Sequence, residues 1–598
     1  MNVINERINK LRELMSEKGI SFYIIPTADY HGSEYIADYF KCREYMSGFT
    51  GSAGTLVVSE DEAALFVDGR YHIQADNETE GTCINVYKLG VKGVPSLSEY
   101  LSEKVLENDV IGYDGRVMMQ SLAEGLFEKM DASFDCEADL ISCLFENREE
   151  LSSKPITILP EEISGKSTSD KIEEIRKIMK EKKVDSVFLS SLDDICYVFN
   201  IRGNDVEYNP VVFSYAYITD QSTTLYLMNG AYDEATVNHF SELGIFIADY
   251  ADILKELFKI KGKKIAVDKE YTSSYFYKVL SLGNDVFDIH NCDVVKKHIK
   301  TEAEQELARK YAVSDAVALI EYIVNLKTIL MDGFDMDEYE ASELLYKFKS
   351  NMKGFVSLSF DTICAYAENA AIVHYSASKD KAKKLQNKGL LLIDSGSQYL
   401  GATTDITRTI VLGELSEEEK IAYTLVLKGN LKLMDATFIK GTRCENLDIL
   451  ARESLWKDGL DYRHGTGHGI GSFLNVHEGP YRIGYKIRDN MPQPDIEPGM
   501  IISDEPGYYE DGKFGIRHET QLLCVKKIET EYGEFYGFEP LSLVPFEKDA
   551  IVFEMLTLEE FYILNRYNQL IIEKVRPYLS EDGKRLLDYN TNYVDWQS

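Results

Sequence analysis

Five residues between positions 389 and 519 have side chains of the types that bind divalent metal ions. They are Asp394, Asp405, His468, Glu505 and Glu519. Four carboxylates and one imidazole suit Mn²⁺, Co²⁺ or Zn²⁺ better than ions that prefer thiolates. The set contains no cysteine, which argues against a structural zinc finger. The chemistry expected of such a site is hydrolysis, because paired cations lower the pKa of a bridging water from about 15.7 toward neutrality.

Two of the carboxylates are predicted to lie on neighbouring strands. Asp394 follows the apolar run LLLI and so ends a buried strand, while Asp405 opens the strand DITRTIVL. The segment between them has the length of a hairpin with a turn near Gly401. Either aspartate alone is more often a turn or cap residue, but the pair beside three further candidates favours a shared metal site.

The histidine candidates cluster in the same part of the chain. His464 and His468 are four residues apart, a spacing that on a helix would suggest zinc. Alternating glycines from 465 to 471 make a helix improbable, and in an extended segment residues 464, 466 and 468 tend to share a face. His374 and His477 are candidates for proton transfer. Each of these histidines alone is at least as often a structural hydrogen-bonding group.

The last two carboxylates accompany predicted strands. Glu505 ends the strand MIISDE before a Pro-Gly turn, and Glu519 is predicted within the strand GIRHETQLLCV. Strand parity puts Arg517 and Glu519 on one face and His518 on the other, so His518 is not expected to be a ligand. A glutamate in an apolar strand is costly unless it is paired or metal-bound, which supports a function for Glu519.

The elements that must position these residues follow a repeated N-terminal unit. Apolar residues at helical spacing over 8–15, followed by the strand ISFYIIP, match residues 172–179 followed by VDSVFLSS, 164 positions later. The match predicts two domains of one architecture, although a helix followed by a strand is also common by chance. Residues 152–162 are predicted to be a linker, residues 296–331 a long helix pair, and residues 557–589 a helical tail.

Composition restricts the expected partners and compartment. The formal net charge of −35 argues against binding nucleic acid or an anionic membrane through a general basic surface. There is no run of 18 apolar residues and no apolar signal-peptide core, so neither a spanning helix nor secretion is expected. The nine scattered cysteines are expected to be reduced thiols of a cytoplasmic protein, although one disulfide is not excluded.

These motifs, in this order, resemble those of the pita-bread metallopeptidases. Over nearly its whole length the chain most closely resembles the long, three-domain, cytosolic-type Xaa-Pro aminopeptidases. The likeness includes FTGSAGTLVV (49–58), DGRYHIQA (68–75), FNIRGNDVEYNPVVFSYA (199–216), HGTGHGIG (464–471) and FEPLSLVP (538–545). It implies an α/β (α+β) fold with creatinase-like domains at 1–154 and 155–297 and a pita-bread catalytic domain at 298–598.

The resemblance implies an aminopeptidase that releases the N-terminal residue from peptides with proline in the second position. Catalysis would use a hydroxide that bridges two divalent ions, with Mn²⁺ favoured over Co²⁺ or Zn²⁺. The enzyme would be a cytoplasmic homodimer that acts on peptides. Two alternatives are a prolidase-type Xaa-Pro dipeptidase and a non-catalytic pita-bread module that binds peptides or proteins.

The resemblance also implies roles for the five candidate ligands. Asp394 would bind one ion through both carboxylate oxygens. Asp405 and Glu519 would serve both ions, and His468 and Glu505 would complete the second. In this interpretation Glu505 would also take a proton from the attacking water.

Further residues receive roles from the resemblance alone. The residues implied to be catalytic are Glu505, His374, His464 and His477. The residues implied to contact substrate are Arg70, His374 and His477. Tyr509 and Arg517 would support the Asp394 ligand. The sequence departs from the family at His518, where an aliphatic residue is usual, and at YLGATTD, which replaces YLDGTTD.

Overall fold

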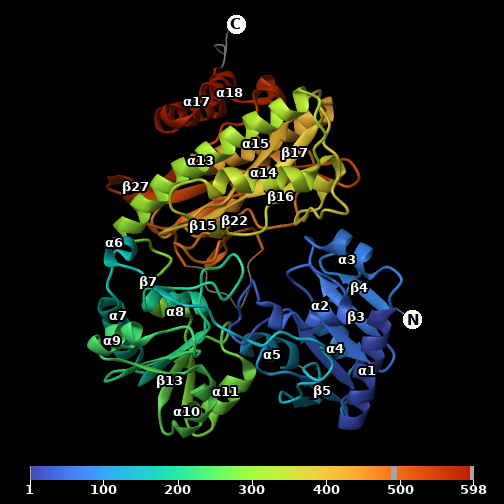
Figure 1. Ribbon diagram of the computed structural model, residues 1–598, viewed down its shortest axis with the longest axis vertical. Helices are drawn as coiled ribbons and strands as arrows, with labels where there is room; N and C mark the ends of the chain where they lie inside the picture. The colour runs from blue at the N-terminus through green and yellow to red at the C-terminus, as the bar shows by residue number, and fades with distance from the viewer. Residues whose placement is uncertain (1, 129, 487–493, 593–598) are drawn as a thin grey trace. The chain divides into compact units, whose positions relative to one another are not determined.

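The computed structural model describes residues 2–128, 130–486 and 494–592. The chain forms two compact units (Figure 1): unit 1 holds residues 1–160 and 166–296, and unit 2 holds residues 161–165 and 297–598. Among the described residues, no helix is long and apolar enough to cross a membrane. All nine cysteines are described, and each is a free thiol.

Unit 1 contains two six-stranded sheets of the same topology. The first has the order β4 (Ile84–Lys88), β3 (Ala63–Val67), β2 (Thr55–Ser59), β1 (Phe22–Pro26), β5 (Val110–Tyr113) and β6 (Ser133–Asp135). The second has the order β12 (Ile245–Asp249), β11 (Thr223–Leu227), β10 (Ser214–Thr219), β8 (Ser186–Leu189), β13 (Lys264–Val267) and β14 (Asp285–Asp288). In the first sheet, β1 pairs antiparallel with β2 and parallel with β5. In the second, β8 pairs antiparallel with β10 and parallel with β13. This shared pattern confirms the predicted duplication.

Helices flank both sheets of unit 1. The helix before each central strand, α1 (Val3–Lys18) or α7 (Thr168–Lys182), buries the apolar stripe expected from the sequence. The other helices near the first sheet are α2 (Cys42–Ser47), α3 (His72–Thr79), α4 (Leu97–Lys104) and α5 (Gln120–Phe127). Those near the second are α8 (Leu192–Val198), α9 (Glu234–Glu242), α10 (Ile253–Lys259), α11 (Ser274–Ser281) and α12 (Asn291–Val294). The domain borders at 154/155 and 297/298 stay predictions.

Unit 2 begins with one helix where the sequence predicted a pair. α13 (Glu302–Met331) runs unbroken for 30 residues, and residues 296–301 are not helical. Its start is set by a capping box between Thr301 and Glu304, which satisfies backbone N–H groups that a helix end leaves unpaired. The partner helix is α14 (Glu338–Ser350), which lies alongside α13 in Figure 1.

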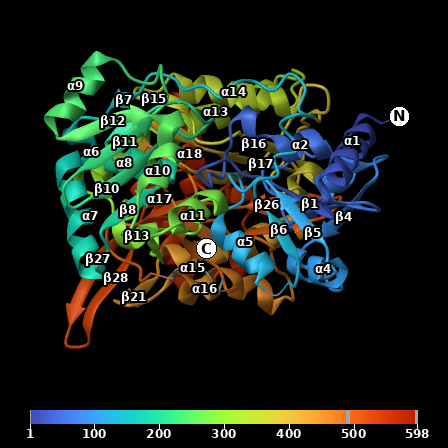
Figure 2. The same cartoon turned by 90° about the horizontal axis from the view of Figure 1, so that it is seen from below.

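The strands of unit 2 form four sheets. The first two are β15 (Phe355–Leu358), β18 (Ser397–Tyr399) and β19 (Ala402–Thr403), and then β16 (Ile363–Tyr366), β17 (Leu390–Ser395) and β20 (Ile406–Val411). The largest has the order β21 (Thr437–Ile439), β28 (Gly533–Pro540), β27 (Thr520–Thr530), β24 (Ile501–Asp504), β22 (Gly467–Gly469) and β23 (Glu478–Ile483). The last pairs β25 (Gly507–Glu510) with β26 (Phe514–Arg517). Figure 2 shows β27 and β28 as a long projecting hairpin.

Helices complete unit 2. They are α15 (Glu417–Met434), α16 (Cys444–Lys457), α17 (Leu558–Lys574) and α18 (Glu581–Thr591). The helical tail predicted over 557–589 is therefore two helices.

The predicted linker at 152–162 contains more structure than expected. It holds β7 (Thr157–Ile158), which pairs with β9 (Ile201–Arg202), and the start of α6 (Glu161–Ser164). Pro160 directly precedes α6, and Glu161 and Glu162 lie in its first turn, where negative charge is favourable.

Candidate metal centre

The candidate ligands lie on or next to strands that neighbour one another in unit 2. Asp394 is in β17, and Asp405 directly precedes β20, the antiparallel partner of β17, which confirms the predicted hairpin. His468 is the middle residue of β22, Glu505 follows β24, and Glu519 precedes β27. β22, β24 and β27 are neighbouring strands of one sheet. Glu505 follows Asp504 and Glu519 precedes Thr520, which pair with each other, so these two glutamates lie at the same end of that sheet.

Glycines bring β22 close to its neighbours. A Cβ atom on Gly467 would lie 1.9 Å from Ser503 O, and one on Gly469 would lie 2.4 Å from Glu478 O. Both are backbone oxygens that cannot move aside like the end of a flexible side chain, so only glycine fits at these positions. The alternation of glycine in this segment is thereby explained by close strand packing.

His468 faces two of the carboxylates. Its Nδ1 lies 2.9 Å from Gly469 O, an oxygen that only accepts, so Nδ1 carries the proton. Its Nε2 lies 3.6 Å from both Asp405 Oδ2 and Glu505 Oε1. These separations exceed hydrogen-bond lengths but suit donors that share one ion at about 2.1 Å each. Donor atoms of Asp405, His468 and Glu519 all lie within 4.8 Å of one another.

The expectation that residues 464, 466 and 468 share a face stays a prediction. β22 starts at Gly467, and the backbone of Thr466 before it is bonded on both sides: its N–H donates to Ile483 O at 2.8 Å, and its carbonyl accepts from Glu505 N at 2.7 Å. The side chain of Thr466 donates a hydrogen bond of 2.5 Å to Asp448 Oδ1 on α16.

A chain of hydrogen bonds holds Asp394. Arg517 Nη2 donates to Asp394 Oδ2 at 2.6 Å, and Arg517 Nη1 donates to Tyr509 OH at 2.9 Å. Tyr509 OH lies 2.8 Å from His464 Nε2. Burial, partly offset by the Arg517 charge, raises the pKa of Tyr509 to about 12, so its hydroxyl keeps its proton. His464 therefore joins the support of Asp394 through Tyr509.

Thr407 is a site residue that the sequence reasoning missed. Its Oγ1 donates to Glu519 Oε2 at 3.0 Å and accepts from Arg517 Nε at 3.2 Å. Thr407 lies two positions after Asp405, so strand parity places both on one face. The sequence could have identified Thr407 in this way, because the residue two positions from a candidate ligand lies on the same face of a strand.

The electrostatics of the cluster favour a bound cation. Burial, followed by the charges of Glu519, Asp394 and Glu505, raises the pKa of Asp405 well above its usual range. Burial and the charges of Asp394 and Glu505 likewise raise the pKa of Glu519. Among the described residues, Asp394 Oδ1 and Glu519 Oε1 are buried without a hydrogen-bond partner. Crowded carboxylates with bare oxygens are costly unless cations neutralise them, so the donor set fits hard divalent ions.

Two further candidate histidines lie in different surroundings. The ring of His477 stands edge-on to that of His468, with centroids 4.3 Å apart. His374 lies in a turn after the short helix η3 (Ala367–Ala371) and is partly exposed. Its neighbour Tyr375 packs against the same apolar cluster as Tyr509. The structure thus brings His477 next to a candidate ligand, while the catalytic roles of both histidines stay predictions.

Comparison with known proteins places the chain in a family. The model of metallopeptidase family M24 matches residues 306–526, and the model of its C-terminal region matches residues 534–593. Two models of the creatinase/prolidase N-terminal domain match residues 7–143 and 147–304. The chain is 40% identical to the probable Xaa-Pro aminopeptidase P of Botryotinia fuckeliana, over 96% of this chain and 90% of that protein. It is 39% identical to that of Sclerotinia sclerotiorum, over 97% and 98%. The chain belongs to the Xaa-Pro aminopeptidase P family.

A solved structure agrees with this family assignment. The X-prolyl aminopeptidase of Caenorhabditis elegans, described as a cytosolic enzyme with a di-nuclear active site, is 29% identical. It superposes with a TM-score of 0.94 and covers 99% of this chain and 100% of its own. The predicted fold class, two creatinase-like domains followed by a pita-bread domain, is confirmed.

His518, the neighbour of Glu519, was not expected to be a ligand of the metal centre in this member of the Xaa-Pro aminopeptidase P family. The side chain is fully buried, and its ring packs edge-on to Tyr423 at 4.3 Å and Phe546 at 5.2 Å. Burial and the nearby Arg408 charge lower the pKa of His518, so it packs as a neutral ring. Its packing agrees with the parity that separated it from Glu519.

Arg70 belongs to unit 1, whereas the five candidate ligands belong to unit 2. Its Nε and Nη2 donate to the two carboxylate oxygens of Asp68 at 2.9 and 2.8 Å. The guanidinium is therefore held in a fixed orientation by its neighbour two residues away. A contact between Arg70 and a substrate stays a prediction.

Proposed function

We propose that this protein is a metal-dependent aminopeptidase that removes the N-terminal residue from peptides with proline in the second position. The proposal is carried by one observation: donor atoms of Asp405, His468 and Glu519 lie within 4.8 Å of one another, with Glu505 3.6 Å from His468. Asp394 and Glu519 each keep a buried carboxylate oxygen without a hydrogen-bond partner among the described residues. We propose that two divalent ions bind here, with Mn²⁺ as the favoured metal. Their ligands would be Asp394, Asp405, His468, Glu505 and Glu519. When bound, such ions supply Lewis acidity that polarises the scissile carbonyl and acidifies water.

Glu505 is suited to accept a proton. Its side chain is 21% exposed, against 5% for Asp405 and 10% for Asp394. A general base must be within reach of the proton it removes, and of these three carboxylates Glu505 is the most accessible to a substrate. We propose that it takes up the proton that the attacking water releases.

The leaving group gives the histidines a task. The leaving nitrogen is the ring nitrogen of proline, which in the scissile bond belongs to a tertiary amide without an N–H, so it must gain a proton to leave. His477, edge-on to His468, is the first candidate donor, and His374 is the second. His464 is proposed to act through Tyr509, and Arg70 to contact the peptide.

The remaining proposals concern the whole protein. A cytoplasmic location is supported by the cytosolic description of the C. elegans relative and by nine free thiols. A homodimer is proposed from the family resemblance alone. For the domain borders, we propose the positions that the sequence predicts, 154/155 and 297/298.

The test compares three peptides. Protein stripped of metal and then supplied with Mn²⁺, Co²⁺ or Zn²⁺ is offered an Xaa-Pro-Yaa tripeptide, an Xaa-Pro dipeptide and an Xaa-Ala-Yaa tripeptide. We expect metal-dependent release of Xaa from the first peptide. Cleavage of the dipeptide alone would indicate a prolidase, and no cleavage of any peptide by metal-loaded protein would indicate a binding module.

A variant tests the assigned base. Glu505→Gln is expected to lower kcat by about 10²–10⁴-fold, the usual contribution of acid–base catalysis, because an amide cannot accept the proton. Glu531→Gln, at the exposed turn between β27 and β28, is the matched control. Wild-type kcat in Glu505→Gln would remove Glu505 from the mechanism.

A further inference from the structure

The backbone at Glu519 is held by side chains and loops. Glu519 lies between β26 and β27, outside the strand ladder. Its N–H donates to Thr407 O at 3.0 Å, and its carbonyl accepts from Arg408 Nη1 at 2.6 Å. Because Oε2 already accepts from Thr407, Oε1 is the remaining carboxylate oxygen, and it lacks a partner among the described residues. The direction of that oxygen therefore depends on how the backbone is fixed.

Arg408 is a buried brace for this backbone. It is 2% exposed, and its Nη1 also donates to Thr407 O at 2.9 Å. Its Nε donates to Val544 O at 3.0 Å, and its Nη2 donates to Tyr567 OH at 2.6 Å. The acceptors of these hydrogen bonds are uncharged, so they fix the position of the Arg408 side chain without neutralising its charge. The planar guanidinium suits such a task, because its donors point in fixed directions.

Tyr567 connects Arg408 to α17. Its side chain is buried on the inner face of α17, and its hydroxyl is 2.6 Å from Ser542 O and 3.0 Å from Val544 O. Ser542 Oγ donates to Asp405 O at 3.2 Å and accepts from Gln521 N at 2.9 Å. The FEPLSLVP segment singled out in the sequence thus contacts the backbone of a second candidate ligand.

We propose that Tyr567 and Arg408 are positioning residues that align Glu519, and through Ser542 also Asp405, for metal binding. Helix α17 then contributes to the metal centre through Tyr567. Partners behind a metal ligand commonly change affinity by about 10- to 100-fold when removed. The inference rests on the metal site of the proposed function, but its readout is metal affinity and needs no peptidase activity.

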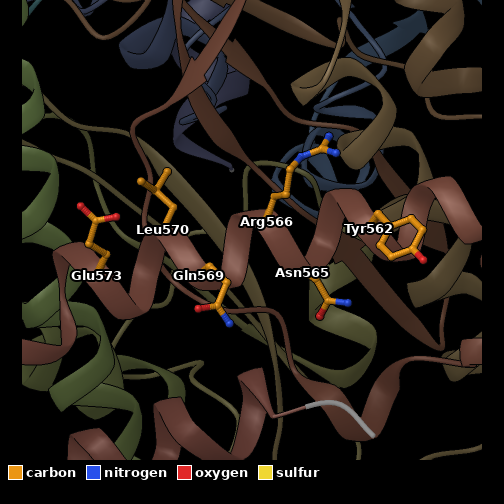
Figure 3. Close-up of a pocket in the computed structure, with 6 residues that line it drawn as sticks. All are labelled: Tyr562, Asn565, Arg566, Gln569, Leu570 and Glu573. Atoms are coloured by element: carbon orange, nitrogen blue, oxygen red, sulfur yellow. The ribbon is translucent and has the colours of Figure 1, made fainter. Parts of the chain in front are cut away.

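The test removes one hydroxyl at a time from the full-length protein. Tyr567→Phe is compared with Tyr322→Phe, a buried tyrosine of α13 whose hydroxyl lacks a hydrogen-bond partner among the described residues. Tyr562→Phe is the surface control. Tyr562 is 55% exposed and lines a groove of about 590 Å³ on the outer side of α17 (Figure 3).

Calorimetric titration of metal-stripped protein with Mn²⁺ gives the affinities, and thermal unfolding of the stripped protein gives stability. We expect Tyr567→Phe to weaken at least one Mn²⁺ site by about tenfold or more. Both controls should stay within about twofold of wild type, whatever the effect on unfolding. In an active enzyme, kcat should fall at saturating Mn²⁺ with little change in KM.

Wild-type Mn²⁺ affinities in Tyr567→Phe would overturn the inference, as would an equal loss in Tyr322→Phe. If Tyr567→Phe does not fold, Ser542→Ala replaces it, because it removes the hydrogen bonds of Ser542 Oγ to Asp405 O and from Gln521 N and leaves the contacts of Arg408 in place. Unchanged affinity then overturns the inference. A wild-type protein that binds Mn²⁺ but cleaves no Xaa-Pro peptide would sink the proposed function alone. A wild-type protein that binds no Mn²⁺ would sink both.

Discussion

At the scale of single residues, the candidate centre gathers four negative side chains and two arginines. Arg517 contacts the Asp394 carboxylate directly, whereas Arg408 contacts the backbone at Glu519. The two arginines therefore differ in task, one pairing with a ligand and the other fixing its direction. Arg517 is 2% exposed, so its bonds are little screened by solvent.

Arg517→Lys should separate charge from geometry. A lysine keeps the positive charge but cannot bond Asp394, Tyr509 and Thr407 at once, as the guanidinium does. We expect metal affinity to fall by about 10- to 100-fold, as for other partners behind a ligand. Titration of stripped protein with Mn²⁺ measures this, and affinity equal to wild type would mean that charge alone suffices.

At the scale of elements, β22 shows why the glycines alternate. Its backbone lies against β24 on one side and β23 on the other, with no room for side chains at Gly467 or Gly469. His468 between them can then present its ring to the carboxylates on the neighbouring strands. The glycines that allow this close approach cost stability, because glycine loses more conformational freedom on folding than any other residue.

Gly467→Ala should be severely destabilising. The new Cβ would meet Ser503 O at 1.9 Å, so β22 and β24 must separate, and we expect a loss above about 4 kcal/mol or failure to fold. Gly125→Ala in α5 is the control, because nothing lies within 4 Å of its Cβ position. Alanine there should stabilise by about 0.5–1 kcal/mol. Denaturant unfolding compares the two, and equal stability would contradict the packing argument.

At the scale of the whole molecule, unit 1 joins its two copies through a buried histidine. His31, in the first copy, has Nδ1 2.8 Å from Ser190 O and Nε2 2.8 Å from Tyr250 OH, both in the second copy. His31 is fully buried, and that burial lowers its pKa despite the nearby Asp29. The folded protein therefore holds this ring neutral.

Acid should weaken this junction. The pKa of His31 is near 6.5 in the unfolded chain and lower in the folded one, so the unfolded state binds more protons below that value. Its contribution to stability is complete above pH 6.5 and is lost as pH falls. We expect the unfolding temperature to drop more between pH 7.5 and 5.5 in wild type than in His31→Phe. Parallel pH profiles would exclude His31 as the source.

Metal removal should also act on the whole molecule. Stripped protein keeps the carboxylates crowded, so we expect its unfolding temperature to rise with added Mn²⁺. By mass action, free metal at 100 times the dissociation constant of one site adds about 2.7 kcal/mol to the free energy of unfolding. His468→Ala should reduce this increment, whereas His239→Ala in α9 should not. An increment unchanged in His468→Ala would place the bound metal elsewhere.

The sequence predicted those features that depend on neighbouring residues. The repeat of α1 with β1 and α7 with β8 was visible because helical and strand periodicities are local. The start of α13 was missed, although the Thr301–Glu304 capping box was present in the sequence. The break before β27 was not readable, because the N–H groups of His518 and Glu519 leave the ladder for Pro506 O and Thr407 O.

The sequence by itself determined which residue types could hold metal, which strands carry them and which family they resemble. Only the tertiary structure decided that Thr407, Arg408, Ser542 and Tyr567 stand behind those residues. The physical reason is that ligand types and strand patterns follow from local chemistry and spacing. The contacts that aim a ligand arise from packing between segments more than 100 residues apart, which no local pattern encodes.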